Sequence, residues 1–565
     1  MSLFSSIQLA NNALQAQKIG LQVAGQNIAN ANTPGYVREQ VNFSPAATQR
    51  KGDLLLGLGV QVDGVVQRID RFLESRLRSS SSDRASAATQ EETYQQLESI
   101  VGELNKTDLS TSLNNFFSSV SEVLNQPESP TVRNLAALQG KTLTGDINRL
   151  VSRVRDARFD VNERVKSVAS DVNRLIEEIR SLNVRITNLE GGGTSQSDAV
   201  GLRDQRGVAL SKLSELVDVK TIEQDSGAVN VFSGGDFLVF EGSAKQVNVA
   251  LSTDRALTIA TLQIAETNSP LQAGSGELAG LYQARDQILG GFIDQIDNLS
   301  STLAFEFNRI FASGQGLTGY QQLTSEFAVD DVTSPLDAAG LKFTPENGNF
   351  QIQVFNKQTG LTQTTDIRVD LNGLDTDTSL TDLAASIGAV SGISASVTSD
   401  RRLSITSDSV NQDFAFAGDS SGILAALGVN TFFSGTTAQD LGVSSTILND
   451  PTKFAASDSG IGQGTGNAVT LAGLLDQPLD SQNGSTLTGL YDQLTGSVTQ
   501  GSAVAKSVAE GFRVFEQALK GKQLAISGVS LDEEAVQLIT FQKAFQASAR
   551  YIATLSDLME ILVNL

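Results

Sequence analysis

Residues 3–36 run LFSSIQLANNALQAQKIGLQVAGQNIANANTPGY, and this stretch decides the fold at one end of the chain. Apolar side chains recur in it every seven residues, in one row made of Ile7, Leu14, Leu21 and Ile28 and a second made of Leu3, Ala10, Gln17 and Ala24. This heptad repeat predicts one helix from residue 3 to about residue 31 with a coiled-coil seam.

The helix should end at Thr33-Pro34-Gly35-Tyr36. Proline disfavours the α conformation of the residue before it, and Pro-Gly suits the two central positions of a type II turn. The helix itself carries almost no charge, because Lys18 is the only charged side chain between Met1 and Thr33. A helix whose outer face meets water normally carries interspersed charges, so this one is expected to be packed on several sides.

The other end of the chain has the same character. Ser530-Leu531-Asp532-Glu533 is a capping box of the S-x-x-E type and should open a helix that runs almost to the last residue. Its two heptad rows are Leu531, Leu538, Phe545, Ile552 and Met559, and Phe541, Ser548, Leu555 and Leu562. The two terminal helices can pair inside one chain, but two weakly charged helices cannot cover each other completely. We therefore expect them to pack against copies of themselves or against a partner.

Between the ends, the 4-3-4-3 spacing of aliphatic residues from Ile147 to Leu189 predicts a long straight helix that stops at Gly191-Gly192-Gly193. Further helices are expected at residues 68–104, 111–125, 200–217, 277–312 and 488–520. Residues 218–265 and 320–445 change to the alternation and Gly-rich turns typical of β-strands.

These patterns predict an α+β multidomain protein with terminal N/C coiled-coil helices, an elongated helical bundle and inserted β-rich domains. The expected domains are residues 1–75 with 520–565 for the terminal helices; 76–217, 272–315 and 450–519 for the bundle; 218–271 for a small β excursion; and 316–449 for an outer β-rich domain.

Composition argues against catalysis. The 565 residues include 63 acidic and 41 basic side chains, for a net charge of −22, and no histidine, cysteine or tryptophan. Without histidine and cysteine there is no Ser-His-Asp triad, thiolate or imidazole metal site, or disulfide. The acidity disfavours binding to nucleic acid. We expect a protein that is not an enzyme and needs no cofactor or metal.

Two stretches could suggest a ligand. The acidic run Asp370, Asp375, Asp377 and Asp382 lacks the spacing of a calcium loop, and a solvated turn is preferred. The glycine-rich residues 460–466 follow no β pattern, so a loop is preferred there to a dinucleotide site.

The N-terminus has neither the basic nor the apolar region of a Sec signal peptide. The strongest apolar run, residues 54–60, is much shorter than the roughly 18 residues that would span a membrane.

Residues 27–36, NIANANTPGY, closely resemble the N-terminal signature of the bacterial flagellar rod, hook and hook-associated proteins. The turn motif within it is Asn30, Thr33, Pro34, Gly35 and Tyr36. Length and the C-terminal stretches 527–534 and 542–550 favour the hook-associated members, which form the junction between hook and filament.

The resemblance implies a structural protein that polymerises at the distal end of the hook, connects it to the filament and is required for filament assembly. Its neighbours would be the hook protein below and the next junction protein above. It would be exported by the flagellar type III apparatus without a cleaved signal, after a cytoplasmic chaperone had shielded its C-terminal helix, and would be secreted to the extracellular flagellum.

The terminal seams would then be the assembly interface. On the N-terminal helix the residues are Leu3, Ile7, Ala10, Leu14, Leu21, Ala24 and Ile28, and on the C-terminal helix Leu531, Leu538, Phe541, Phe545, Ile552, Leu555, Met559 and Leu562. The alternatives are a hook or distal-rod subunit, a secreted coiled-coil effector or adhesin, and a carboxylate glycosidase. The large inserts disfavour the first, the matched low-charge ends disfavour the second, and the lack of any tuned acid/base pair disfavours the third.

Overall fold

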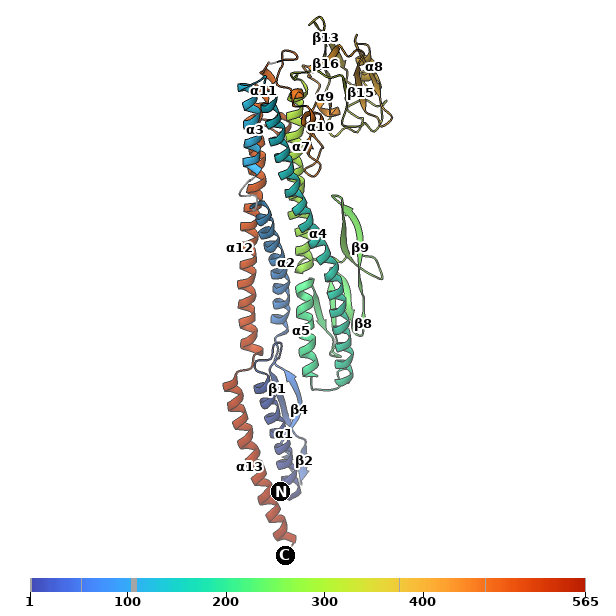
Figure 1. The fold of residues 1–565 in the computed structure, drawn as a ribbon. Helices are drawn as coiled ribbons and strands as arrows, with labels where there is room; N and C mark the ends of the chain where they lie inside the picture. The colour runs from blue at the N-terminus through green and yellow to red at the C-terminus, as the bar shows by residue number, and fades with distance from the viewer. Residues whose placement is uncertain (1–2, 52, 103–108, 375, 463, 564–565) are drawn as a thin grey trace. The chain divides into compact units, whose positions relative to one another are not determined.

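A computed structural model describes the chain apart from residues 1–2, 52, 103–108, 375, 463 and 564–565 (Figure 1). Residue contacts divide it into two compact units. The first comprises Met1–Thr93, Phe159–Asp286 and Ala503–Leu565, and the second comprises Tyr94–Arg158 and Gln287–Ser502. Three of the four boundaries between them fall inside the helices α2 Arg71–Gly102, α4 Pro130–Leu189 and α12 Leu487–Ser527, and the fourth falls inside the π-helix of residues 284–289.

In the first unit, the terminal helices α1 Leu3–Asn30 and α13 Leu531–Val563 lie side by side (Figure 1). Two antiparallel strand pairs follow α1, formed by β1 Glu39–Pro45 with β4 Val60–Gln67 and by β2 Thr48–Lys51 with β3 Leu54–Gly57. Both terminal helices were predicted from the heptad rows. The strand pairs were not predicted. In the β1–β4 pair the register changes between Asn42 and Phe43, which interrupts the alternation that marks a strand.

The β-strands of residues 218–271 in the first unit pack on the C-terminal half of α4 and on α5 Val200–Leu216. Its four-stranded sheet contains β5 Lys220–Glu223, β6 Val229–Ser233, β7 Asp236–Phe240 and β8 Ser243–Ala244, and a hairpin contains β9 Val247–Asp254 and β10 Leu257–Ile264. The chain then enters α6 Gly276–Gln283. Their shared core is aliphatic, as the seam of α4 predicts.

Three asparagines on α4 pin these strands to the helix. The Asn173 amide donates to the carbonyl of Val247 and accepts from its N–H, both at 2.7 Å. Asn183 makes the same two bonds with Val229, at 2.8 and 3.1 Å. The side-chain amide of Asn162 donates to the carbonyl of Thr258 and accepts from the N–H of Ala260, both on β10. A side-chain amide thus replaces a neighbouring strand and satisfies backbone groups that burial would otherwise leave unpaired.

In the second unit, α3 Leu109–Asn125, α7 Gly290–Ala312 and α11 Gly466–Gly473 surround a cluster of aromatic rings. A six-residue π-helix, residues 284–289, leads from α6 into α7. The rings are Phe116, Phe117, Phe307, Phe311, Phe432, Phe433 and Phe454. Gly140 of α4 lies against them, since a Cβ there would be 2.7 Å from the Phe432 ring.

The β-rich part of the second unit forms two three-stranded sheets, ordered β13-β12-β16 and β11-β15-β14. Their elements are β11 Gln322–Thr324, β12 Gly348–Asn356, β13 Thr362–Val369, α8 Leu380–Gly388, β14 Ile393–Val397, β15 Leu403–Ser407 and β16 Gln412–Ala417. They share one apolar core. Short elements follow: α9 Ile423–Leu427, β17 Phe433–Ser434, β18 Gly442–Val443, α10 Ser445–Asn449, and 3-10 turns at Pro451–Lys453, Leu474–Asp476 and Asp480–Gln482.

The α+β class is confirmed, and each predicted helix has a counterpart. Two helices are longer than predicted: α4 begins at Pro130 rather than near Ile147, and α12 continues to Ser527. The early part of α4 contains Gly140 and Gly145, which lower helix propensity, and packing against the aromatic cluster outweighs that cost. The units divide the predicted bundle between them. The finer four-part division stays a prediction.

Candidate functional site at the paired terminal helices

The contact between α1 and α13 depends on small side chains on α1. A Cβ added to Gly20 would lie 2.9 Å from three ring atoms of Phe541, so glycine is what allows the ring to lie against the α1 backbone. The ring of Phe43 approaches the same phenyl group, with 6.2 Å between centroids. The buried residues of α1 are Ser6, Ala10, Ala16, Gly20, Val23, Ala24 and Asn27.

This buried face differs from the predicted N-terminal seam. Only Ala10 and Ala24 of the predicted residues are buried, and the others, Leu3, Ile7, Leu14, Leu21 and Ile28, are half-buried. The large aliphatic residues are thus only partly covered within the chain, and their predicted place in an assembly interface stays a prediction. Of the buried residues of α1, Gly20 lies against Phe541 of α13, where its lack of a side chain lets the ring approach the backbone closely.

The predicted C-terminal seam lies closer to the contact face. Leu555 is buried, and Leu538, Phe541, Phe545, Ile552 and Met559 are half-buried. Leu531 is exposed, and the side chain of Leu562 lies outside the described residues. The role of either seam in assembly stays a prediction.

The turn after α1 has the predicted geometry. The N–H of Tyr36 donates to the carbonyl of Thr33 at 3.2 Å, and Gly35 has a φ of +80°, as position i+2 of a type II turn requires. The Thr33 hydroxyl donates to the side-chain oxygen of Asn30 at 3.2 Å. Pro34 and Gly35 occupy the centre of this turn.

Beyond the turn, a buried polar cluster connects both ends of the chain. The Asn27 amide donates to the carbonyl of Glu39 and to the carboxylate of Glu534, at 3.0 and 3.1 Å, and accepts from Tyr36 at 2.8 Å. Nε of Arg38 donates to Glu534 at 2.7 Å. The start of α13 is therefore held by the segment that leaves α1.

Burial and neighbouring charges shift the pKa values of the titratable groups in and beside this cluster. Burial first, and then the charges of Glu39, Asp204 and Glu534, raises the pKa of Tyr36 well above its ordinary value. Burial also raises the pKa of Glu39. Burial raises the pKa of the Asp204 carboxyl to about 6, although Gln67 and the backbone of Val37 donate hydrogen bonds to it.

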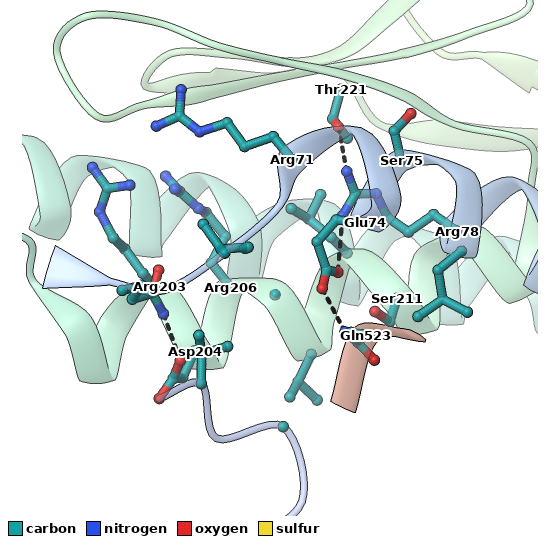
Figure 2. Close-up of a pocket in the computed structure, with 18 of the residues that line it drawn as sticks. Arg71, Glu74, Ser75, Arg78, Arg203, Asp204, Arg206, Ser211, Thr221 and Gln523 are labelled. Carbon is teal, nitrogen blue, oxygen red and sulfur yellow. Dashed lines mark hydrogen bonds and ion pairs between the residues drawn. The ribbon is translucent and has the colours of Figure 1, made fainter. Parts of the chain in front are cut away.

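A cavity of about 790 Å³ lies beside this cluster, between the turn, the start of α2 and α5. Figure 2 shows Arg78 reaching toward both Thr221 and Glu74, and Gln523 donating to Glu74. Arg203 is bonded to Glu190 and Glu223. A carboxyl with a raised pKa, such as that of Asp204, can indicate an active site when it lines a cavity. Here the charged side chains around the cavity are bonded to one another, which is a structural role.

The described residues contain no group of three or more acidic side chains placed to hold a metal ion. Of the acidic run in the β-rich region, Asp382 accepts from the N–H of Ser379, the N-cap of α8, and Asp377 accepts from the N–H of Gly373 at 3.0 Å. Asp375 lies outside the described residues. No helix in the described part of the chain is long and apolar enough to cross a membrane.

Sequence comparisons match the same regions. Residues 94–327 match the family described as the flagellar hook-associated protein FlgK helical domain. Residues 7–36 match the flagella basal body rod proteins, and residues 521–565 match the C-terminal region of the flagellar basal body rod FlgEFG proteins. Over its length, the sequence is 25% identical to flagellar hook-associated protein 1 of Escherichia coli, covering 99% of this chain and 100% of that protein. Over nearly its whole length, the chain therefore resembles flagellar hook-associated protein 1.

Other relatives agree. Flagellar hook-associated protein 1 of Salmonella typhimurium is 23% identical over 99% of this chain and 100% of its own length, and that of Bacillus subtilis is 24% identical over 57% of this chain and 69% of its own. The fold matches the flagellar hook junction protein FlgK of Burkholderia pseudomallei with a TM-score of 0.53 at 16% identity, over 80% of this chain and all of that one.

The two rod-protein matches coincide with α1 and its turn, and with the end of α12 and α13. The regions of this chain that match rod proteins thus contain the paired helices, together with Asn27, Tyr36 and Glu534 of the polar cluster. The sequence analysis did not identify Gly20, Asn27 and Arg38 as residues that join the two ends of the chain. Asn27 lies inside the recognised motif, but neither the motif nor the heptad pattern indicates that its amide would bond to Glu534.

Proposed function

We propose that this chain is a structural subunit of the bacterial flagellum that polymerises at the distal end of the hook, connects the hook to the filament and is required for filament assembly. The observation that carries the proposal is a set of uncovered apolar side chains, in two pairs, on one face of α13. Val536, Ile539, Leu558 and Ile561 are all exposed although α13 is paired with α1. A soluble monomer rarely leaves such a face open, whereas an assembling subunit needs one.

The nearly uncharged α1 supports the same conclusion. With Lys18 as its one charged residue, α1 has little to keep it solvated once it is exposed. Helices of this kind suit the axial core of a tube, where each pair packs against neighbouring pairs. Full-length similarity to proteins named flagellar hook-associated protein 1 supports placing that tube at the hook–filament junction.

The proposal also names the binding partners of the chain. They are further copies of the chain in an axial zone, the hook protein below and the next junction protein above. A cytoplasmic export chaperone would cover the exposed apolar side chains of α13 before export. The protein would be secreted without a cleaved signal peptide and would reside extracellularly. The protein is proposed to have no enzymatic activity and no nucleic-acid or membrane partner, and the structural names of its relatives support this.

A hook or distal-rod subunit is the nearest alternative, because the two ends match rod-protein families. The match of residues 94–327 to a hook-associated helical domain disfavours it. A secreted effector or adhesin would not need two ends of this kind.

Labelled antibody on isolated hook–basal bodies tests the proposal. A narrow band at the tip of the hook is expected, and label along the whole hook or rod would contradict it. The variant Val536→Asp with Ile539→Asp should remove the band and the filament. The control Leu251→Asp changes an equally exposed apolar residue on β9 and should leave both in place. Normal filaments with the α13 variant would show that its outer face is not used.

A further inference from the structure

Aromatic and cationic side chains form a patch on α2 and α12 of the first unit. The guanidinium of Arg76 lies 5.8 Å from the ring centroid of Phe72 and 5.9 Å from that of Phe515. The two rings are nevertheless 71% and 45% exposed. Val504 and Val508 extend the same face of α12, at spacings of seven and four residues that keep them in line with Phe515. We call these five residues the α2–α12 patch.

The composition of this patch is that of a protein interface. Aromatic residues and arginine are enriched at the centres of interfaces, where they contribute most of the binding energy. Arg76 holds the two rings in place in the free chain, so little side-chain entropy would be lost when a partner covers them.

Charge indicates what the partner should carry. Residues 503–527 contain four basic and two acidic side chains, in a chain whose net charge is −22. Both acidic groups are already bonded, Glu510 to Arg513 at 3.0 Å and Glu516 to Arg84 at 2.9 Å. Arg76 has no carboxylate partner among the described residues. An acidic and apolar surface would therefore complement the patch.

The start of α13 offers such a surface. Asp532, Val536 and Ile539 are exposed, and their spacing of four and three residues places them on one face of the helix. Within the chain, α13 packs on α1 rather than on α2 or α12. One copy therefore presents two different complementary surfaces, and neither is covered. Surfaces of this kind associate head to tail and build open polymers.

We propose that the α2–α12 patch of one copy binds the Asp532–Val536–Ile539 face of a second copy, with Asp532 paired to Arg76. The contact rests on the proposed function, because it repeats from copy to copy in an assembled zone. It also assigns a specific site on the neighbouring subunit as the partner of Val536 and Ile539, two of the exposed apolar residues of α13.

Cross-linking in assembled flagella tests the contact directly, because the chain has no cysteine of its own. Two versions are expressed in the same cells, one with Phe515→Cys and an epitope tag, the other untagged with Val536→Cys. Hook–basal bodies are isolated and treated with a short bismaleimide. A heterodimer of tagged and untagged chains is expected, and it can arise only between two copies. The matched control replaces Val536→Cys with Leu558→Cys, which is also exposed on α13 but lies far along the helix.

The outcomes separate the two proposals. If both chains are present at the hook tip and no heterodimer forms, or if Leu558→Cys gives as much heterodimer as Val536→Cys, the contact is wrong and the junction function stands. If the wild-type chain is absent from the hook tip, the proposed function itself fails.

A charge exchange gives an independent readout. Arg76→Glu should lower the fraction of hooks that carry the protein roughly tenfold, by placing like charges at the contact. Adding Asp532→Arg should restore it, and adding Asp557→Arg, at an exposed acidic position further along α13, should not. Equal rescue by both, or by neither, would overturn the pairing.

Discussion

Nε of Arg38 donates to Oε1 of Glu534 at 2.7 Å, which joins two residues 496 positions apart in the chain. The N–H of Arg38 also donates to the carbonyl of Ser527, at the end of α12. The segment leaving α1 is thus bonded to the segment entering α13 through both backbone and side chain. The proposed axial pair is therefore one structural element, although its two helices lie at opposite ends of the sequence.

Removing one member of this ion pair should loosen α13. The side chains of Arg38 and Glu534 are 7% and 1% exposed, so Arg38→Met leaves a buried charge without its partner. A cost of about 3–5 kcal/mol is expected, seen as faster hydrogen exchange in the first turns of α13. The double variant Arg38→Met with Glu534→Leu should cost less than Arg38→Met alone.

Glu533 provides the matched control for that pair. It also bonds to Arg38, at 2.6 Å, but its side chain is 62% exposed. Glu533→Gln should therefore cost less than about 1 kcal/mol. If Glu533→Gln and Glu534→Gln had equal effects on exchange, burial would not govern the strength of this contact.

The close approach at Gly20 makes a second prediction. Gly20→Ala places a methyl group 2.9 Å from the Phe541 ring, and overpacking of this kind costs about 1–3 kcal/mol, reduced by about 1 kcal/mol of helix propensity. Gly25→Ala meets nothing within 4 Å and should stabilise α1. Hydrogen exchange of α1 amides compares the two variants, and Phe541→Leu should relieve Gly20→Ala. Equal effects of the two alanines would contradict the packing argument.

The sequence predicted the terminal helices but not the contacts that join them. Heptad rows predicted α1 and α13, because periodicity is a local property of the chain. They could not predict that Gly20, rather than the large Leu14 or Leu21, would face Phe541, since both faces of a weakly charged helix are candidates until its neighbour is known. The Arg38–Glu534 pair depends on the meeting of the two ends, and no short-range pattern encodes that. The bonds of Asn183 to Val229 could not be predicted either, because a polar residue in a helix rich in charged side chains is normally expected to be exposed.

The carboxyl of Asp204 should make the stability of the N-terminal segment depend on pH. Its pKa is raised from 3.8 to about 6 in the folded chain, so the folded state binds the proton more tightly than the unfolded state does. Stability is then fully present below pH 3.8 and falls as pH rises toward about 6, by less than the full shift would give because the carboxyl is partly solvated. The pKa of Glu39, also raised by burial, adds a change of the same sign.

Asp204→Asn should remove most of this dependence, since asparagine stays neutral and can still accept from Gln67. Hydrogen exchange at the amides of residues 37 and 67, measured between pH 4 and 7 and corrected for intrinsic exchange, gives the comparison. A wild-type profile that is flat over this range, or one identical to that of Asp204→Asn, would show that burial does not control this carboxyl.

The asparagine contacts on α4 make the last prediction. Asn183→Ala leaves both the N–H and the carbonyl of Val229 without a partner in a buried site, which should cost about 2–4 kcal/mol in the docking of the four-stranded sheet. Arg206 would also lose an acceptor, since it donates to the same Asn183 oxygen at 3.0 Å. Asn248→Ala removes an exposed asparagine on β9 and should change stability by less than about 0.5 kcal/mol. Limited proteolysis within residues 220–264 measures the difference, with faster cleavage expected for Asn183→Ala only. Equal cleavage of both variants would mean that the aliphatic core, rather than the amide bonds to β6, holds the sheet on α4.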